Sequence, residues 1–401
     1  MHALIIAQYF YPDFGGASTR AYNSALALKM QGCDVTVVTA FPHYPHGNVP
    51  DKYKGKLLIQ EEISSLRVIR TWIPSLPHSS VRNRITLHLS FILSSLFALR
   101  YIKKIDIIIA MNPNLFSFYS AIIYRLIFRR KLIRNVDDLW PEIFYDLGIV
   151  KSKLAKKLLD RLAKFSYHTS SHLIPVSSGY IRTLVDKYRV SSEKITVIEQ
   201  GVDITRFSKA TNSPSDPKTK KIILYSGALN EGYDFKAVIE TAKVLQSEPV
   251  HFIIRGSGVM YISIQKMIEE NGLSNIEVNN KLLPIDELVA LMNEADIFLL
   301  PMNSPSVFDQ GLPTKILEYQ ALARPIVCIS EGEARRYILQ TKSGLVAKPG
   351  QIIELAKIIT KLIRDDTLCK ELGNNGYKNV INNLTLEKIG LRLLEVIKKY
   401  D

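Results

Sequence analysis

Short apolar runs alternate with helical patterns along the first half of the chain. Between these runs, apolar residues recur at helical spacing, as they do over 18–30 and 115–128. Buried strands that alternate with helices are typical of a parallel, doubly wound sheet. The first half therefore predicts an α/β domain. Its predicted strands are 3–7, 34–39, 105–110, 131–136 and 173–176.

A second α/β pattern begins after the polar segment 209–221, which resembles a linker. A last helical pattern over 386–399 follows the polar pair Asn382 and Asn383. We therefore expect two Rossmann-like domains, at 1–205 and 206–380, and a C-terminal segment, 381–401, that returns to the first domain. The second set of predicted strands is 222–225, 250–254, 297–300 and 326–329.

Length and charge support this division. The 401 residues exceed what one hydrophobic core usually organises, and 47% of them are hydrophobic. The net charge is +14, and it is unevenly distributed, with 27 Lys and Arg against 14 Asp and Glu in residues 1–200. An anionic partner of the first half would explain this asymmetry, whether phosphate, lipid headgroup or nucleic acid. A solvated basic surface is the alternative, and no nucleic-acid motif is present.

The cysteines and the start of the chain indicate a compartment. Cys33, Cys328 and Cys369 lie far apart and form no CxxC motif, so we expect neither a disulfide framework nor a zinc site. The apolar run 3–7 has no basic leader and no small-residue cleavage site, which favours a first strand over a signal peptide. These features predict a reducing, cytoplasmic location.

The first turn between a strand and a helix carries two glycines. Gly15 and Gly16 would let the backbone approach a ligand at the start of a helix, and Arg20 lies one turn further on. The dinucleotide motif GxGxxG is absent, and no acidic residue follows the second strand to bind a ribose. A plain glycine turn explains this segment equally well.

The strongest local pattern lies at 309–325. Pro313 favours the start of a helix there, so the amides of Thr314 and Lys315 would be free to bind a diphosphate. Lys315 would add a full charge, and Glu318, about one turn on, could accept hydrogen bonds from ribose hydroxyls. An ordinary capped helix with a surface carboxylate is the alternative.

This segment resembles the signature of the family 4 retaining glycosyltransferases, which have two acidic residues eight positions apart at this helix. Glu318 matches the second, which binds the nucleotide ribose in that family. Gln310 takes the place of the first, which contacts the donor sugar, and Asp309 is a neighbouring candidate. The resemblance also implies that Gly311 and Leu312, in the same helix start, lie in the donor site.

Further motifs resemble the O-antigen and colanic-acid type of sugar transferases in this family. They are Tyr9–Pro12 with Gly15 and Gly16, Thr39–Gly47, Asp138–Glu142, Pro175–Gly179 and Glu199–Asp203. The resemblance implies the GT-B fold, with two Rossmann-like domains facing across a cleft. It also implies metal-independent, retaining transfer of an N-acetylhexosamine or related hexose from a UDP-sugar. The acceptor would be a lipid-linked saccharide or a glycan, in the assembly of cell-surface polysaccharide or glycoprotein glycans.

The sequence departs from this family where many relatives bind the donor diphosphate with Arg and Lys. That turn begins at Gly227, and Leu229 occupies the Arg position. The substitutes are Lys315, Arg20 and Arg255, the last of which directly precedes Gly256. Two rival functions stay open: a sugar-nucleotide epimerase of the same fold, and a non-catalytic nucleotide-sugar-binding subunit.

Candidate acceptor-binding residues follow two strands of the first half. Asp138 and Glu142 flank Trp140, and either carboxylate could serve as a catalytic base. A loop carboxylate that caps the next helix is the alternative. His43 and His46 could contact a sugar, although a surface histidine is the commoner case.

Residues 82–104 predict a helix that contacts the membrane. Their uncharged stretch, 85–99, is shorter than the ~20 residues that span a bilayer, and basic residues flank it. An interfacial helix on anionic lipid has this composition, and so does a helix buried between sheets. We expect peripheral association with the cytoplasmic face of the cell membrane.

Overall fold

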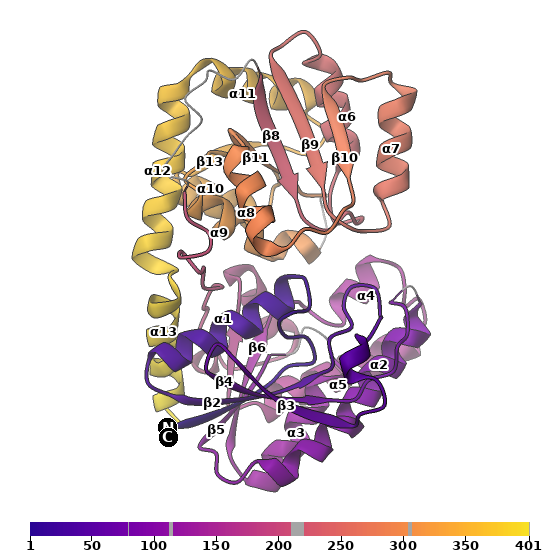
Figure 1. Cartoon of the computed structure of the whole chain (residues 1–401), viewed down its shortest axis with the longest axis vertical. Helices are drawn as coiled ribbons and strands as arrows, with labels where there is room; N and C mark the ends of the chain where they lie inside the picture. Colours follow the sequence, from indigo (N-terminus) through magenta and orange to yellow (C-terminus); the bar gives the residue numbers. More distant parts are fainter. Residues whose placement is uncertain (79, 112–114, 210–219, 304–306, 401) are drawn as a thin grey trace. The chain divides into compact units, whose positions relative to one another are not determined.

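The computed structural model describes residues 1–78, 80–111, 115–209, 220–303 and 307–400 (Figure 1). The chain divides into two compact units. Unit 1 comprises Met1–Gly201 and Leu386–Asp401, and unit 2 comprises Val202–Thr385. Each unit is an α/β sheet with helices on its faces, so the expected fold of two Rossmann-like domains is confirmed.

Unit 1 contains a seven-stranded sheet in the order β3-β4-β2-β1-β5-β6-β7. Neighbouring strands are parallel except β3 and β4, which form an antiparallel hairpin at the edge. The strands are β1 (His2–Ile6), β2 (Asp34–Ala40), β3 (Leu58–Ile63), β4 (Leu66–Thr71), β5 (Ile107–Ala110), β6 (Lys131–Val136) and β7 (His172–Pro175).

The helices of unit 1 cover this sheet and complete its core. Apolar residues of β1, β2 and β5 pack with Leu87 and Phe91 of α2 and with α3. The α-helices are α1 (Gly16–Met30), α2 (Val81–Ser95), α3 (Phe118–Phe128), α4 (Glu142–Asp146), α5 (Lys153–Thr169) and α13 (Leu386–Lys398). Short 3-10 or π-helices are η1 (Asp51–Tyr53), η2 (Leu96–Tyr101), η3 (Ser178–Tyr180), η4 (Thr183–Lys187) and η5 (Ser192–Lys194).

The last helix of the chain, α13, packs against α1 within unit 1. Gly390 allows this close approach, because a Cβ atom there would lie 2.4 Å from the carbonyl oxygen of Ala27. Arg392 of α13 forms an ion pair with Glu199 at 2.8 Å. The C-terminal helix is therefore part of the first α/β core, next to the first helix of the chain.

Unit 2 contains a six-stranded parallel sheet in the order β10-β9-β8-β11-β12-β13. The strands are β8 (Lys221–Ser226), β9 (Val250–Arg255), β10 (Ile276–Asn279), β11 (Ile297–Pro301), β12 (Ile326–Ile329) and β13 (Gly344–Ala347). The helical elements are α6 (Phe235–Val244), α7 (Tyr261–Glu270), α8 (Ile285–Glu294), η6 (Val307–Gln310), α9 (Thr314–Ala321), α10 (Glu333–Thr341), α11 (Ile352–Arg364) and α12 (Asp366–Asn383).

The core of unit 2 fixes the position of α9. The ring of Tyr319 stacks on Phe298 of β11 with 4.0 Å between centroids. Its hydroxyl accepts a hydrogen bond from the amide of Ser226, at 3.0 Å, where β8 ends. These two contacts of Tyr319 hold the start of α9 near the carboxyl end of β8, where α/β sheets usually bind ligands.

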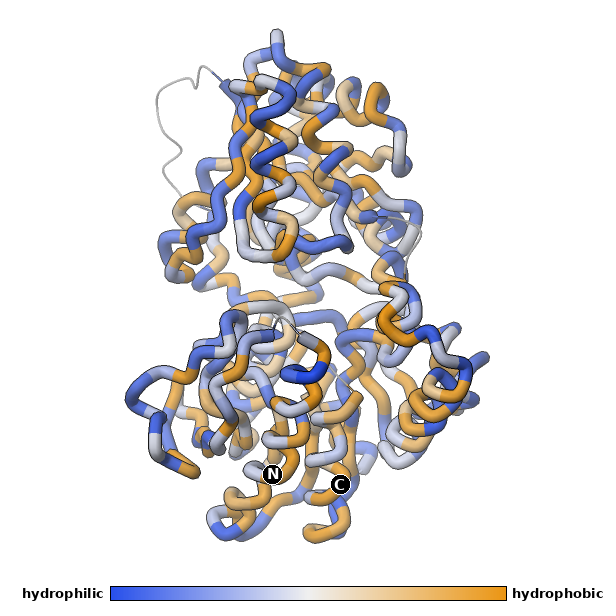
Figure 2. The backbone as a smooth tube through the Cα atoms, turned by 90° about the vertical axis from the view of Figure 1, so that its right-hand side faces the viewer, coloured by the Kyte–Doolittle hydropathy of each residue, from blue (hydrophilic) through white to orange (hydrophobic). Residues whose placement is uncertain are grey.

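Along the outer helices of both units, hydrophobic and hydrophilic residues alternate (Figure 2).

Two sequence expectations need adjustment. The helix expected over 82–104 is not continuous: α2 ends at Ser95, η2 follows to Tyr101, and residues 102–104 are not helical. Most of the polar segment 209–221 lies outside the described residues, and Lys221 already belongs to β8. Within the described ranges, no helix has the length and apolar character required to cross a bilayer.

Candidate functional site

Two glycine-containing loops interlock at the carboxyl ends of β8 and β9 in unit 2. The amide of Gly227 donates to the carbonyl of Arg255 at 3.0 Å. A Cβ atom at position 256 would lie 1.6 Å from the carbonyl oxygen of Gly227, so only glycine fits there. The predicted site residues Gly227, Arg255 and Gly256 are thus in direct contact, backbone against backbone.

The start of α9 exposes backbone donors beside these loops. Pro313 is its N-cap residue and offers no side-chain hydrogen bond, and the first turn holds no acidic residue. The first amides of a helix lack intrahelical acceptors, and the helix dipole adds partial positive charge there. The amides of Thr314 and Lys315 can therefore attract an anion, as the sequence predicts.

The side chain of Lys315 extends from α9 back to the turn after β8. Its ammonium donates hydrogen bonds to the hydroxyls of Tyr225, at 2.9 Å, and Tyr233, at 3.0 Å. It also lies so close to the turn that a Cβ atom at Gly227 would be 2.3 Å from Nζ. A full positive charge thus lies at this turn although it originates on another element.

Glu318 lies one turn into α9 and is partly buried. Desolvation raises the pKa of its carboxyl group to about 7, and the charge of Lys315 counteracts part of that rise. Any hydrogen-bond donor that reaches such a group stabilises its charged form. Glu318 is therefore suited to accept hydrogen bonds from paired hydroxyl groups near neutral pH.

The acidic candidate before α9 is bound to a neighbouring loop. Asp309 accepts a hydrogen bond from the hydroxyl of Ser330 at 2.9 Å. Gly332 packs so tightly on it that a Cβ there would lie 2.2 Å from the Asp309 carbonyl oxygen. Gln310 and Gly311 are partly buried and Leu312 is buried. Asp309 thus anchors this segment to the loop between β12 and α10.

The other two basic candidates have different surroundings. Arg20 of α1 is buried in unit 1, where it forms an ion pair with Asp137 at 3.0 Å and donates to the carbonyl of Ile198 at 2.8 Å. Arg255 is buried, donates to the carbonyl of Lys281, and has its pKa lowered by desolvation. Of the three proposed substitutes, Lys315 is the one whose cation lies against the Gly227 turn.

In unit 1, the loops after β1 and β2 are joined by one buried carboxylate. Asp13 accepts hydrogen bonds from the amides of His43, at 2.8 Å, and Tyr44, at 2.9 Å. Desolvation raises its pKa to about 6. Gly15, the N-cap residue of α1, lies against the Tyr44 ring, and Gly16 begins the helix. The glycine turn and the loop of the predicted histidines therefore share one surface.

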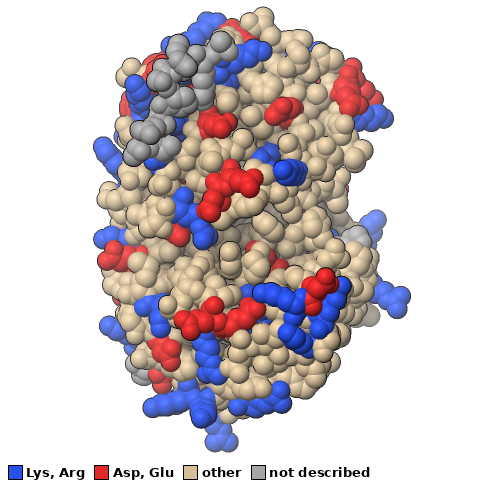
Figure 3. All heavy atoms as spheres, viewed as in Figure 1, with Lys and Arg blue, Asp and Glu red and all other residues tan. Residues whose placement is uncertain are grey.

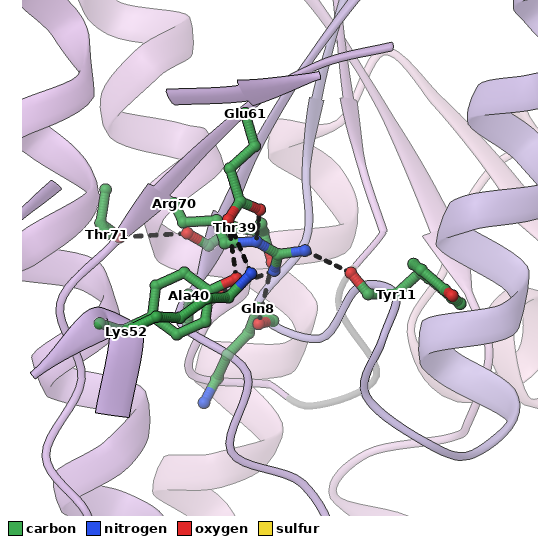
Figure 4. A network of polar contacts seen from close by, with 9 residues as sticks. Gln8, Tyr11, Thr39, Ala40, Lys52, Glu61, Arg70 and Thr71 are labelled. Atoms are coloured by element: carbon green, nitrogen blue, oxygen red, sulfur yellow. Dashed lines mark hydrogen bonds and ion pairs between the residues drawn. The ribbon is translucent and has the colours of Figure 1, made fainter. Parts of the chain in front are cut away.

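A buried arginine connects the loop after β1 with the end of β2 (Figure 4). Arg70 of β4 is fully buried and forms an ion pair with Glu61 at 2.7 Å. It donates to the carbonyl oxygens of Tyr11, in the loop after β1, and of Ala40, the last residue of β2. A buried charge with all these partners makes the loop positions rigid.

The two histidines predicted for the acceptor differ in position. His46 is exposed. His43 is buried and stacks on Tyr9 and on His78, with ring centroids 5.2 and 5.4 Å away. Its Nδ1 is 2.8 Å from the carbonyl of Phe41, which can only accept, so Nδ1 carries the proton and Nε2 is an acceptor. Burial lowers the pKa of His43 to about 4, so the ring is neutral at neutral pH.

Sequence reasoning missed Asp13, Tyr9 and His78 in this cluster. Tyr9 and Asp13 belong to the segment after the first strand that also carries Gly15, so their place at a strand end was an available signal. His78 comes from the segment before α2, and nothing in its sequence neighbours indicates that it stacks on His43.

The carboxylates that follow β6 differ in whether they have a polar partner. Asp137 pairs with Arg20, and Glu142 accepts hydrogen bonds from Lys187, at 2.8 Å, and from the hydroxyl of Tyr188, at 2.6 Å. Asp138 has no ion-pair partner among the described residues. Desolvation and the nearby charge of Asp137 raise its pKa to about 7.

Two neighbouring features complete this segment. Trp140 packs on Phe144 with 4.5 Å between ring centroids, next to Asp138 in sequence. Across the described ranges, no cluster of three or more His, Cys, Asp or Glu side chains could hold a metal ion.

Family models match both halves of the chain. "Glycosyltransferase Family 4" matches residues 14–206, and "Glycosyl transferases group 1" matches residues 207–379. Their boundary at 206/207 lies close to the boundary of the two structural units at 201/202. The matched ranges include the glycine turn of unit 1 and the start of α9.

A relative and two solved structures extend these matches. The Escherichia coli (strain K12) glycosyl transferase WcaI, named for colanic acid biosynthesis, is 27% identical over 346 residues, which cover 82% of this chain and 84% of WcaI. Sucrose-phosphate synthase from Thermosynechococcus elongatus has a TM-score of 0.78 at 16% identity, covering 100% of this chain and 99% of that chain. Anabaena Alr3699/HepE, solved in complex with UDP, has a TM-score of 0.67 at 17% identity, covering 100% of both chains. These structures share the fold with this chain.

Proposed function

The chain belongs to the glycosyltransferases that these two family models describe, with the GT-B fold, and we propose that its donor is a UDP-sugar. The sugar would be an N-acetylhexosamine or a related hexose. Its acceptor would be a lipid-linked saccharide or a glycan in the assembly of cell-surface polysaccharide or glycoprotein glycans. The colanic acid relative supports a polysaccharide pathway, and the UDP complex of a structural neighbour supports the nucleotide.

One observation in unit 2 carries the donor site. The uncapped start of α9 and Lys315 belong to the first turn of one helix, and Glu318 lies one turn further on. Amides and an ammonium complement a diphosphate, and a carboxylate complements two ribose hydroxyls. Gln310, from the segment before α9, would donate and accept hydrogen bonds with the hydroxyl groups of the sugar.

The proposed reaction retains the configuration at the anomeric carbon. The bond from that carbon to the diphosphate oxygen breaks, and the acceptor oxygen attacks the same face. The helix dipole and Lys315 would stabilise the negative charge on the leaving diphosphate, so the proposed reaction needs no metal. The acceptor's proton would leave with the diphosphate or with a base of unit 1.

Unit 1 supplies the proposed acceptor contacts. Asp138 is the candidate base, since its pKa of about 7 allows it to take up a proton near neutral pH. Neutral His43 offers Nε2 as a hydrogen-bond acceptor for a sugar hydroxyl. Glu142, bound to Lys187 and Tyr188, is better placed to orient this segment than to react. Trp140 and His46 would contact the acceptor from the same loops.

We also propose that unit 1 contacts an anionic membrane surface, which would present a lipid-linked acceptor. Five exposed apolar side chains follow one stripe of α2 and η2 at four-residue spacing: Val81, Ile85, Leu89, Leu93 and Phe97. Arg82, Arg84 and Arg100 accompany them. Lys and Arg side chains are prominent on the lower part of the face drawn in Figure 3, which is unit 1 in this view.

The test is a transfer assay with the purified full-length chain. The protein is incubated with a panel of nucleotide sugars and lipid-linked acceptors, and products are detected by mass. We expect a mass increase of one hexose or N-acetylhexosamine unit that depends on both substrates. Glu318→Ala should abolish transfer without lowering the melting temperature, and Glu270→Ala, an exposed carboxylate on α7, is the matched control.

Other outcomes would assign other functions. A changed sugar nucleotide formed without an acceptor would indicate an epimerase. Tight UDP binding with no product from any pair would indicate a binding subunit. Full activity of Glu318→Ala would contradict the donor site as described.

A further inference from the structure

Two tyrosines from outside α9 determine where the Lys315 ammonium lies. Tyr225 is on β8 and Tyr233 is in the turn that follows. Besides their two hydrogen bonds, both rings face the cation, which is 4.4 Å from the centroid of Tyr225 and 4.1 Å from that of Tyr233. Hydroxyl oxygens and ring faces are both electron-rich, so each tyrosine attracts the ammonium through its hydroxyl oxygen and through its ring face.

The tyrosines are themselves fixed by the core. Tyr225 is fully buried, and its hydroxyl donates to the carbonyl of Ala228 at 2.6 Å, which leaves its oxygen to accept from Lys315. The ring of Tyr225 packs edge-on against Tyr233 and against Phe235, with centroids 5.2 and 5.1 Å away. The ammonium is therefore held by side chains that have little freedom to move.

The ammonium held there forms no ion pair with any described residue. The tyrosine hydroxyls use two of the three N–H donors of the ammonium. Within the described part of the chain, no carboxylate oxygen lies within ion-pair distance of Nζ. By contrast, Lys187 and Lys221 each pair with two carboxylates. A fixed cation with a spare donor and no acidic partner is suited to bind an anion.

The turn beside this cation contains no positive charge of its own. Residues 226–233 include neither Lys nor Arg. Gly227 leaves room for the ammonium, since a Cβ there would lie 2.3 Å from Nζ and 2.9 Å from Cε. Lys315 thus supplies at this turn, from a distant part of the sequence, the charge that the turn lacks.

We infer that Tyr225 and Tyr233 are positioning residues that hold the Lys315 ammonium as the cation for the donor diphosphate. The inference rests on the proposed donor site and adds how its charge is placed. It makes the hydroxyl groups of these tyrosines part of diphosphate recognition although neither needs to touch the nucleotide. It also makes Gly227 a requirement of the same site.

The test compares nucleotide and nucleoside binding by the full-length chain. Calorimetry and ligand-observed NMR give the dissociation constants of UDP and uridine for the wild type, Lys315→Met, and Tyr225→Phe with Tyr233→Phe. Phenylalanine keeps the rings and removes the hydroxyls. We expect UDP binding to weaken about 10- to 100-fold in Lys315→Met and about 10-fold in the double phenylalanine variant. Uridine binding should stay the same.

A third variant separates positioning from a general structural role. In the Lys315→Met background, the two phenylalanine substitutions should cause no further loss of UDP binding, because the cation that they position is gone. Tyr377→Phe, on an exposed ring of α12, is the matched control and should bind UDP like the wild type.

Two patterns of weakened binding would overturn the inference. One is an equal loss from the phenylalanine substitutions with and without Lys315. The other is a parallel weakening of UDP and uridine. If the wild type binds UDP but Lys315→Met binds it equally well, the inference fails and the proposed function stands. If the wild type binds no nucleoside diphosphate from a panel of UDP, ADP and GDP, the proposed function fails as well.

Discussion

At the scale of single residues, the titration of Glu318 offers a direct test of the ribose contact. Its pKa is raised to about 7, so the carboxyl group is neutral below that pH and charged above it. A charged carboxylate accepts hydrogen bonds from hydroxyls more strongly than a neutral acid does. We expect the affinity for UDP to increase about 10-fold between about pH 6 and pH 8, as measured by calorimetry.

The control for this pH dependence is Glu318→Gln. UDP has phosphate groups that titrate in the same range, and the variant experiences that titration equally. The wild-type curve should therefore rise relative to the glutamine curve as the pH increases. Two parallel curves would show that Glu318 does not contact the nucleotide as a carboxylate.

Asp138 should make the folded protein less stable at the pH at which its carboxylate would act as a base. Its pKa is raised from 3.8 to about 7, so between these values the folded protein keeps a proton that the unfolded chain releases. The unfolding free energy therefore decreases as the pH rises through this range, by about 1–4 kcal/mol in total. Asp138→Asn removes this cost, and its stability advantage over the wild type should grow from about pH 5 to pH 8.

Chemical denaturation at several pH values measures this difference, and the transfer assay should show loss of activity in the same variant. Glu193→Gln, which replaces an exposed carboxylate, is the control and should leave stability unchanged at every pH. An Asp138→Asn variant that is less stable than the wild type at pH 8 would contradict the assignment of Asp138 as an unpaired, desolvated acid.

At the scale of elements, α2 divides its two faces between the core and the surface. Leu87 and Phe91 are fully buried, whereas Leu89 and Leu93 are 50% and 68% exposed. We expect Leu89→Asn with Leu93→Asn to weaken binding to anionic phospholipid vesicles at least ~10-fold, because each inserted leucine contributes about 1.5–3 kcal/mol when fully buried. Co-sedimentation with vesicles measures the change.

Two controls define the membrane result. Leu339→Asn replaces an exposed leucine of α10 in unit 2 and should not affect vesicle binding. Binding of the wild type should decrease with increasing salt, since basic residues accompany the stripe. Equal vesicle binding by the α2 variant and the wild type would remove this helix from the membrane contact.

Elements also differ in how far the sequence predicts them. Continuous apolar runs located β1, β2, β5 and β6 to within two residues at each end. The hairpin of β3 and β4 was missed, because β3 contains Gln60, Glu61 and Glu62 and lies at the sheet edge. Its two-residue turn is Ser64-Ser65, both with positive φ, without the Asn-Gly pair that usually marks such turns.

In the candidate site, the sequence likewise does not predict contacts between residues that are far apart along the chain. The composition of 309–325 was enough to predict a helix start with amides, a cation and a carboxylate. The contacts of Lys315 were not predictable, since its partners Tyr225 and Tyr233 are 90 and 82 residues away. The same holds for His78 on His43, because periodicity reveals the face of an element and not its neighbour.

At the scale of the whole molecule, unit 1 is completed only by the last helix of the chain. The chain leaves unit 1 after Gly201 and returns at Leu386, and the two connecting segments meet where the amide of Val202 donates to the carbonyl of Leu384 at 2.8 Å. Helix α13 then covers α1, with buried Ile389, Leu393 and Val396. The stability of the first core therefore depends on residues that follow all of unit 2.

Gly390→Val should separate the stabilities of the two units. A Cβ at this position would lie 2.4 Å from the Ala27 carbonyl oxygen, so α13 must move away from α1. Glu395→Val introduces the same residue at an exposed position of the same helix without the clash. It is a strict control, because valine has a lower helix propensity than glutamate but a higher one than glycine. We expect Gly390→Val to lower the unfolding free energy of unit 1 by about 1–3 kcal/mol more than this control.

In the Gly390→Val variant, amide hydrogen exchange in α1 and α13 should accelerate, whereas the amides of α9 should stay protected and the affinity for UDP should stay the same. Faster exchange throughout both units would mean that they unfold as one, and that the last helix stabilises the nucleotide site as well as the first core.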